Sequence, residues 1–420
     1  MSLFDRHRPR LDAALDAVLR GGVEVSPPAA PLDGAAEDAF RRLLGRSFSL
    51  PGAVGDGRLG DERSPWGLDL AITYPAATPA AWLQAAEGAR PGWAEAAVET
   101  RVGVLMEALA RLEADAGPLA HAVAHTTGQP VAMAHARSGP VGFARALEVT
   151  AQAFAAVKRV PATERRPSTA GDGRAIERRW RVVPRGAALV VGTATSPVEA
   201  AAAGLFASLA TGHPVLVKPS PTAILPLALV VATLRAVLIE AALPADAVQL
   251  CVDTADAPVT KALAADAAVR VIDYAGGVAF ADWLTRHTPA ARRHLETPGL
   301  NPVVVDATDD ARGLCRRLAA AVLRHAGQTV TAPRLIFVPT DGIPTEAGHW
   351  SFDDVARGLA EAIDAELDEA GAAALGCLRS DAAAEVVRRA QPLGRIVREA
   401  RRVEVAGWPR ARTLSPLVLA

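Results

Sequence analysis

The stretch His325–Pro333, HAGQTVTAP, carries the clearest signal for the fold of this chain. It follows Asp310–His325, whose pattern is that of an amphipathic helix, and it precedes the apolar run Leu335–Val338. A helix, a loop and a buried apolar segment in this order are typical of an α/β protein. The segments on either side of the loop extend this pattern.

Apolar runs alternate regularly with helical stretches upstream of that loop. The pattern predicts a parallel sheet with right-handed crossovers, so we expect a doubly wound α/β fold. The expected strands are Ala187–Val191, Val215–Val217, Val248–Val252, Val269–Ile272 and, past the crossovers, Val303–Val305. The expected helices are Val198–Ala210, Ala223–Ala242, Ala257–Ala265 and Val278–Arg286. We expect Thr222 to cap the apolar helix that begins at Ala223.

The remaining segments are less regular. Phe4–Leu19 and much of Gly92–Val157 are expected to be helical. Residues 161–181 are polar, rich in Arg and broken by Gly and Pro, which predicts a linker or a protruding arm. Ser351–Glu369 should form a further helix, opened by a capping box of Ser351 and Asp354.

Composition excludes several classes of protein. The 420 residues contain 45 basic and 46 acidic side chains and no basic stripe, so no nucleic-acid partner is expected. The N-terminus has no apolar signal segment, and the apolar run Ile224–Leu234 is shorter than the roughly 20 residues of a membrane span, so no membrane association is expected. The three cysteines are far apart, which favours a reducing cytoplasm and no disulfides.

Two residue types are used sparingly enough to make each occurrence informative. Lysine occurs only at positions 158, 218 and 261, and the chain has a single asparagine, Asn301. Lys218 follows a buried strand, where a cation faces the crevice that binds ligands in open α/β sheets. A solvated surface lysine is the alternative.

Three further segments could carry chemistry. Val190–Pro197 and Val271–Gly277 each run from a strand through glycine into a helix, as at a phosphate or flat-ligand site, or simply as tight turns. Glu296, ahead of a Pro-Gly turn, is either a positioned general base or a surface carboxylate. His121 and His125 share one helix face but lack the metalloprotease pattern, and Asp306, Asp309 and Asp310 favour helix capping, so no metal site is expected.

Taken in order, these segments resemble the aldehyde dehydrogenase superfamily. The matching motifs are VKP at 217–219, YAGG at 274–277, ETPGLNP at 296–302 and GQTVTAP at 327–333. The segments Glu62–Pro75 and Phe206–Pro219 are similar to the phenylacetic acid degradation branch of that superfamily. The resemblance implies NAD(P)-dependent oxidation of a small-molecule aldehyde to an acid in aromatic catabolism, and a possible homo-oligomer.

The resemblance also implies an organisation and a set of site residues. Residues 1–295 would hold the N-terminal helices and the dinucleotide-binding domain, with its Rossmann core at about 182–295 and the polar arm at about 161–181; residues 296–420 would be the catalytic domain. Glu296 would be the base and Gln328 would shape the nucleophile loop. The cofactor, NAD or NADP, would contact Thr193, Ala194, Thr195, Lys218, Gly276 and Gly277.

The chain differs from the family at positions that carry out the reaction. Val330 stands where the family has the cysteine that attacks the aldehyde, and an isopropyl group cannot attack a carbonyl. The oxyanion-holding asparagine falls at Ala194 or Thr195, and neither has an amide. The chain ends at Ala420, where the family continues, so the second domain is expected to be incomplete. These departures predict impaired or absent turnover; a non-catalytic nucleotide-binding or scaffold protein is the alternative to an enzyme.

Overall fold

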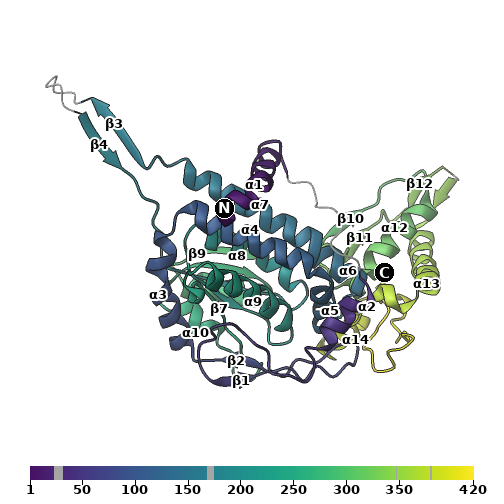
Figure 1. Cartoon of the computed structure of the whole chain (residues 1–420). Coiled ribbons are helices and arrows are strands. Elements are labelled where there is room, and N and C mark those ends of the chain that lie inside the picture. Colours follow the sequence, from purple (N-terminus) through teal and green to yellow (C-terminus); the bar gives the residue numbers. More distant parts are fainter. Residues whose placement is uncertain (23–31, 168–174, 347, 379–380) are drawn as a thin grey trace.

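A computed structural model describes residues 1–22, 32–167, 175–346, 348–378 and 381–420 (Figure 1). Helices dominate the first part. Its elements are α1 (Leu3–Leu19), α2 (Gly34–Arg41), β1 (Gly57–Leu59), β2 (Tyr74–Ala76), α3 (Pro79–Glu95), α4 (Val98–Ala114), α5 (Ala116–Thr127), α6 (Val131–Ala136), η1 (Arg137–Val141) and α7 (Gly142–Lys158). The helices expected at the N-terminus and between Gly92 and Val157 are therefore confirmed.

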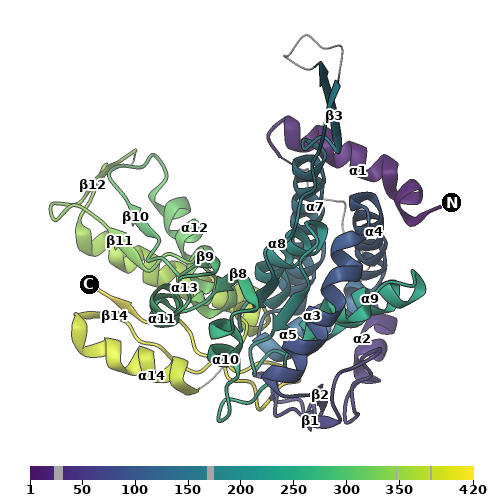
Figure 2. The same cartoon turned by 90° about the vertical axis from the view of Figure 1, so that its left-hand side faces the viewer.

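The centre of the molecule is a five-stranded parallel sheet. Its strands are β5 (Ala187–Val191), β6 (Val215–Lys218), β7 (Val248–Leu250), β8 (Val269–Ala275) and β9 (Arg292–Glu296), in the order β7-β6-β5-β8-β9. Helices α8 (Pro197–Ala210) and α9 (Leu225–Glu240) pack on one face, and α3 and α10 (Thr260–Ala265) on the other. Helix α11 (Val278–His287) follows β8 (Figure 2). The expected doubly wound α/β fold is confirmed.

The strand order fixes where a ligand would bind. The chain moves outward from β5 to β6 and β7, then returns to place β8 on the other side of β5. The connections therefore diverge between the carboxyl ends of β5 and β8, which is the usual ligand crevice of such sheets. Val190–Pro197 and Val271–Gly277 end at this point.

The cap of α9 differs from the one expected. Thr222 does not cap the helix; its hydroxyl lies 3.1 Å from that of Ser220. Instead, the carboxylate of Glu62 accepts hydrogen bonds from the backbone amides of Ile224 and Leu225, the second at 3.1 Å. A residue 162 positions away in the sequence thus satisfies the helix N-terminus, which no local pattern could reveal.

The last part of the chain forms a second α/β unit. Strands β10 (Pro302–Val304) and β11 (Leu335–Phe337) are parallel, and α12 (Ala311–Leu323) packs against α13 (Phe352–Leu375). The other elements are η3 (Arg324–Gly327), β12 (Ile343–Thr345), β13 (Gly348–Trp350), α14 (Asp381–Ala390), η4 (Gln391–Leu393), β14 (Ile396–Arg398) and β15 (Val418–Leu419). The capping box of Ser351 and Asp354 is confirmed, and Asp310 caps α12 as expected.

The hydrophobic core has separate parts. One large cluster runs through the helices and the central sheet up to Ala291. Smaller clusters lie around Cys315 and Ile363 and around Ile343. The division at residues 295–296 stays a prediction, although the clusters are distributed in the same way.

The arm expected at residues 161–181 is a two-stranded hairpin. Strands β3 (Thr163–Pro167) and β4 (Ala175–Arg179) pair antiparallel, and Figure 1 shows them projecting from the body. Residues 168–174 of the expected arm lie outside the described residues. The exposed side chains of Ile176 and Trp180 leave apolar surface on or beside this hairpin.

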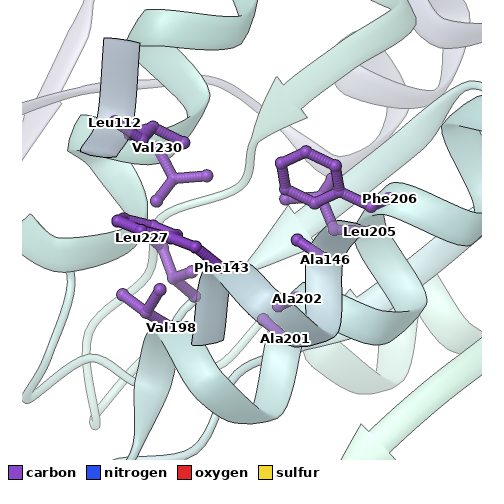
Figure 3. A pocket seen from close by; sticks show the side chains of 10 residues that line it. All are labelled: Leu112, Phe143, Ala146, Val198, Ala201, Ala202, Leu205, Phe206, Leu227 and Val230. Carbon is purple, nitrogen blue, oxygen red and sulfur yellow. The ribbon is translucent and has the colours of Figure 1, made fainter. Parts of the chain in front are cut away.

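Two features carry no site. A cavity of about 10 Å³ among apolar side chains of α4, α7, α8 and α9 barely has room for one water molecule and offers it no polar partner (Figure 3). His121 and His125 are buried and stack on Phe40, and no metal-binding cluster occurs within the described ranges.

Among the helices that the structure describes, none is both long and apolar enough to cross a membrane.

Candidate active site

The loop around Val330 is held in an unusual backbone conformation. His325 and Ala326 have φ values of 52° and 50°, a left-handed region that side chains other than glycine rarely adopt. The imidazole Nε2 of buried His325 lies 3.2 Å from the carbonyl oxygen of Thr127. The side-chain amide of Gln328 donates to the carbonyl of Cys377 at 2.8 Å. These contacts from distant segments hold the strained turn in its conformation.

Val330 itself points outward from this loop. Its side chain is 61% exposed, whereas Thr329 beside it is buried. The Thr329 hydroxyl has no hydrogen-bond partner among the residues that the structure describes. Cys315 is buried within α12, and burial raises the pKa of its thiol, which disfavours the reactive thiolate.

Glu296 lies at the end of β9, beside the crevice. Its side chain is exposed, and its carbonyl oxygen accepts a hydrogen bond from the backbone amide of Gly276 at 2.9 Å. The structure therefore brings the expected base next to the YAGG turn. Gly277 opens α11, and the space where its Cβ would be is free of atoms within 4 Å.

Asp273 was not expected from the sequence. It lies on the same face of the sheet as Glu296, because β8 residues 273 and 275 pair with β9 residues 294 and 296. Its half-buried carboxyl has no hydrogen-bond or ion-pair partner among the described residues. Burial, with a smaller contribution from the charge of Glu296, raises the pKa of Asp273 to about 6.

The turn after β5 lines the other side of the crevice. Thr193 accepts a hydrogen bond from the backbone amide of Ser196 at 2.9 Å, and Ala194 is half-buried. The carbonyl oxygen of Thr195 accepts from the side-chain amide of Gln129 at 2.5 Å. Gln129 is fully buried, and its Oε1 atom has no hydrogen-bond partner within the described part of the chain.

Gln129 is thus an amide at the crevice that the sequence analysis missed. The signal was present in the turn HTTGQP, residues 125–130, but only the fold brings that turn to Thr195. An unpaired buried acceptor fits a ligand or water that donates a hydrogen bond there.

Lys218 lies at the end of β6 in a buried ion pair. Its ammonium is 2.5 Å from Oδ1 of Asp253 and 2.5 Å from the carbonyl of Pro219. Desolvation lowers the pKa of Lys218, and the charge of Asp253 opposes that shift. The alternative of a solvated surface lysine is therefore excluded, while a role in cofactor binding stays a prediction.

The carboxyl ends of β5 and β8 lie where the strand order reverses, which is the usual binding place of a dinucleotide in sheets of this kind. Gly192 follows β5, Gly276 and Gly277 follow β8, and the Oε1 atom of Gln129 has no hydrogen-bond partner among the described residues. The structure brings Glu296 together with Gly276 and Gly277. The turn 193–195 and Lys218 end neighbouring strands of the same sheet edge.

Comparison with known proteins gives the family. The model of the aldehyde dehydrogenase family matches residues 62–349. The chain belongs to this family. The NAD-dependent aldehyde dehydrogenase of Burkholderia multivorans is 35% identical, with a TM-score of 0.95 over 100% of this chain and 77% of its own.

More distant relatives agree on the family or fold. N-succinylglutamate 5-semialdehyde dehydrogenase of Pseudomonas fluorescens (strain Pf0-1) is 28% identical over 261 residues, which cover 61% of this chain and 50% of that protein. The chain spans about half the length of the curated relatives it matches. The 1-pyrroline-5-carboxylate dehydrogenase of Thermus thermophilus is 20% identical with a TM-score of 0.67 over 94% of this chain and 78% of its own, which shows a shared fold.

The family expected from the motifs is confirmed, but its narrower branch is not supported. None of the relatives described above is named as a phenylacetic acid degradation protein.

Proposed function

We propose that this chain binds a nicotinamide dinucleotide in the crevice between β5 and β8 but does not oxidise aldehydes through a covalent intermediate. The supporting observation is the exposed isopropyl side chain of Val330 in the loop 325–333, at the position where the resemblance places the cysteine of the family. When bound, the cofactor would supply a hydride acceptor. The chain would supply Glu296 as the base but nothing that can attack the carbonyl carbon.

The expected cost of these departures is large. Loss of the nucleophile in an enzyme that uses one lowers turnover by about 10⁶, and loss of an oxyanion donor by a further 10²–10³ or so if the two act independently. The buried, unpaired state of the Thr329 hydroxyl supports no replacement, because no base among the described residues hydrogen-bonds to it.

Binding and turnover can be tested separately. Quenching of tryptophan fluorescence by NAD and by NADP measures binding, and we expect saturation with at least one of them. Absorbance at the nicotinamide wavelength should stay flat with saturating cofactor and a panel of aldehydes. The panel contains phenylacetaldehyde and N-succinylglutamate semialdehyde, which separates the substrate suggested by the motifs from that named by the relatives. Any cofactor-dependent turnover that survives Glu296→Gln and disappears with Thr329→Val would refute the proposal.

The second candidate function is an active NAD(P)-dependent dehydrogenase of the same family. The half-buried Asp273 beside Glu296 favours it, since a paired set of carboxyls can hold and pass a proton. Steady production of NADH or NADPH by the natural chain, lost on Glu296→Gln, would establish this candidate in place of the first.

We also propose that the chain self-associates through the β3–β4 hairpin. An isolated two-stranded hairpin is marginally stable in water, and this one bears exposed Ile176 and is followed by exposed Trp180. Light scattering should give a mass above 43.5 kDa for the natural chain and a lower mass for Ile176→Glu/Trp180→Glu. Equal masses for both would refute self-association at this site.

A further inference from the structure

The single asparagine of the chain occupies a position with two simultaneous demands. Asn301 has a φ of 47°, in the left-handed region. Pro302 follows it, which makes an extended backbone the preferred one at position 301. Asparagine tolerates the left-handed conformation better than most residues with a side chain. Contacts around Asn301 must therefore hold it there.

Those contacts join two segments of the candidate site. The Asn301 amide nitrogen donates to the carbonyl oxygen of Val330 in a very short hydrogen bond, and it lies 3.3 Å from the carbonyl oxygen of Ala332. The backbone amide of Arg334 donates to the carbonyl of Leu300 at 3.2 Å. The pairing of β10 with β11 then begins at Pro302 and Leu335. Asn301 thus stands where the segment after Glu296 meets the loop after His325.

Glycine and aspartate each meet only one of these two demands. Glycine reaches the φ but has no side-chain donor. Aspartate has the shape and the φ tolerance but only acceptors when ionised, and these would face two carbonyl oxygens. This explains why a chain that otherwise avoids asparagine has one here.

The hydrogen bonds from the Asn301 amide to the carbonyls of Val330 and Ala332, called the tether below, have a consequence for residue 330. Because the carbonyl of residue 330 is bound to Asn301, the peptide plane after that residue is fixed. The side chain at position 330 is then directed away from the tether, toward solvent, as its 61% exposure shows.

We propose that Asn301 is a positioning residue that sets the direction of the side chain at position 330 relative to the base segment that begins at Glu296. The proposal rests on the assignment of residues 325–333 as the former nucleophile loop, which belongs to the proposed function. It does not depend on cofactor binding or on turnover.

An introduced thiol reports on this geometry. Val330→Cys places a sulfur at an exposed position, whereas all three natural cysteines are buried with raised thiol pKa values, that of Cys377 to about 12. The alkylation rate measured with iodoacetamide therefore reports on the thiol at position 330 and not on the natural cysteines. The rate constant is measured from pH 6 to 10 without nucleotide or aldehyde.

Three further variants are compared in the V330C background. Asn301→Gly retains the φ and removes both donors, and Asn301→Asp retains the shape and adds a negative charge. Leu300→Ala is the matched control, since it shortens the exposed neighbouring side chain and leaves the tether intact. Circular dichroism checks that each variant is folded.

We expect Asn301→Gly to change the alkylation rate by about fivefold or more, because losing a hydrogen bond of about 1 kcal/mol lets position 330 adopt other orientations. Asn301→Asp should move the pH midpoint of alkylation upward, because a nearby carboxylate disfavours the thiolate. Leu300→Ala should leave rate and midpoint unchanged. Profiles of both Asn301 variants that coincide with V330C would overturn the proposal, even if the melting temperature falls. If the Asn301→Gly variant does not fold, the pH midpoint of alkylation in Asn301→Asp tests the proposal by itself.

Discussion

Asp273→Asn should make the protein more stable, and more so at higher pH. The carboxyl lies between β8 and α8 without a hydrogen-bond or ion-pair partner among the described residues. A Cβ at position 204 would lie 2.4 Å from its Cγ atom, so glycine at that point of α8 makes room for it. The amide of asparagine has nearly the same shape and carries no charge.

The magnitude follows from the pKa of Asp273, which is raised from 3.8 to about 6. The native state therefore binds more protons than the unfolded state between these two values, and stability falls as pH rises through that window. The cost of ionisation is roughly 1.5 kcal/mol at pH 5 and roughly 3 kcal/mol at pH 8. Below about pH 3.8 the carboxyl imposes no cost.

Urea unfolding followed by circular dichroism at pH 5 and pH 8 measures the effect. We expect the stability gain of Asp273→Asn over the natural chain to grow by about 1.5 kcal/mol between the two pH values. Asp282→Asn, at an exposed position of α11, is the control and should show no such growth. A gain that is equal at both pH values, or that shrinks at pH 8, would refute the argument.

Three other substitutions have definite outcomes. Glu62→Gln removes a carboxyl whose pKa burial raises to about 6. In urea titrations the unfolding free energy of the variant, relative to that of the natural chain, should therefore rise by about 1.5 kcal/mol between pH 4.5 and pH values above 6. Lys218→Met leaves Asp253 buried without its partner and should cost about 3–5 kcal/mol by the same assay, part of which Lys218→Met/Asp253→Leu should restore; no loss in the single variant would contradict a buried ion pair. Ser351→Ala breaks the capping box of α13 and should lower the unfolding free energy by about 1 kcal/mol, whereas an unchanged value would mean that the helix end is held by tertiary packing.

The sequence predicts the elements of this fold better than their junctions. The strands of the central sheet are short apolar runs bounded by turn residues, and four of its five strands follow from that pattern alone. The fifth, β9, reads RRHLE and alternates between exposed and half-buried residues at the sheet edge, so hydrophobicity does not reveal it. Strand β7 ends at Leu250, two residues before the expected Val252, although the backbone amide of Cys251 still donates to the carbonyl of Val217 at 2.8 Å.

The candidate site could be predicted only where its parts are local in sequence. The loop 325–333 and the turns after β5 and β8 have recognisable residues. Gln129, Asp253 and Asp273 could not be assigned to the site from the sequence, because the fold brings each close to a distant residue: Thr195, Lys218 and Glu296, respectively. The cap of α9 by Glu62 could not be predicted from the sequence for the same reason, because Glu62 is distant in sequence from the helix.

The strained turn at His325 and Ala326 is held by contacts that do not depend on the side chain at position 330. Each left-handed residue of this kind costs on the order of 1 kcal/mol or more, and it persists only where surrounding contacts fix it. Here those contacts come from Thr127, Cys377 and Asn301, and none of them involves the side chain at position 330. The conformation of the loop is therefore independent of what residue 330 carries. Under the proposed function, a cysteine could be exchanged for valine at that position without breaking any of these contacts, so the loop would keep its shape without a thiol.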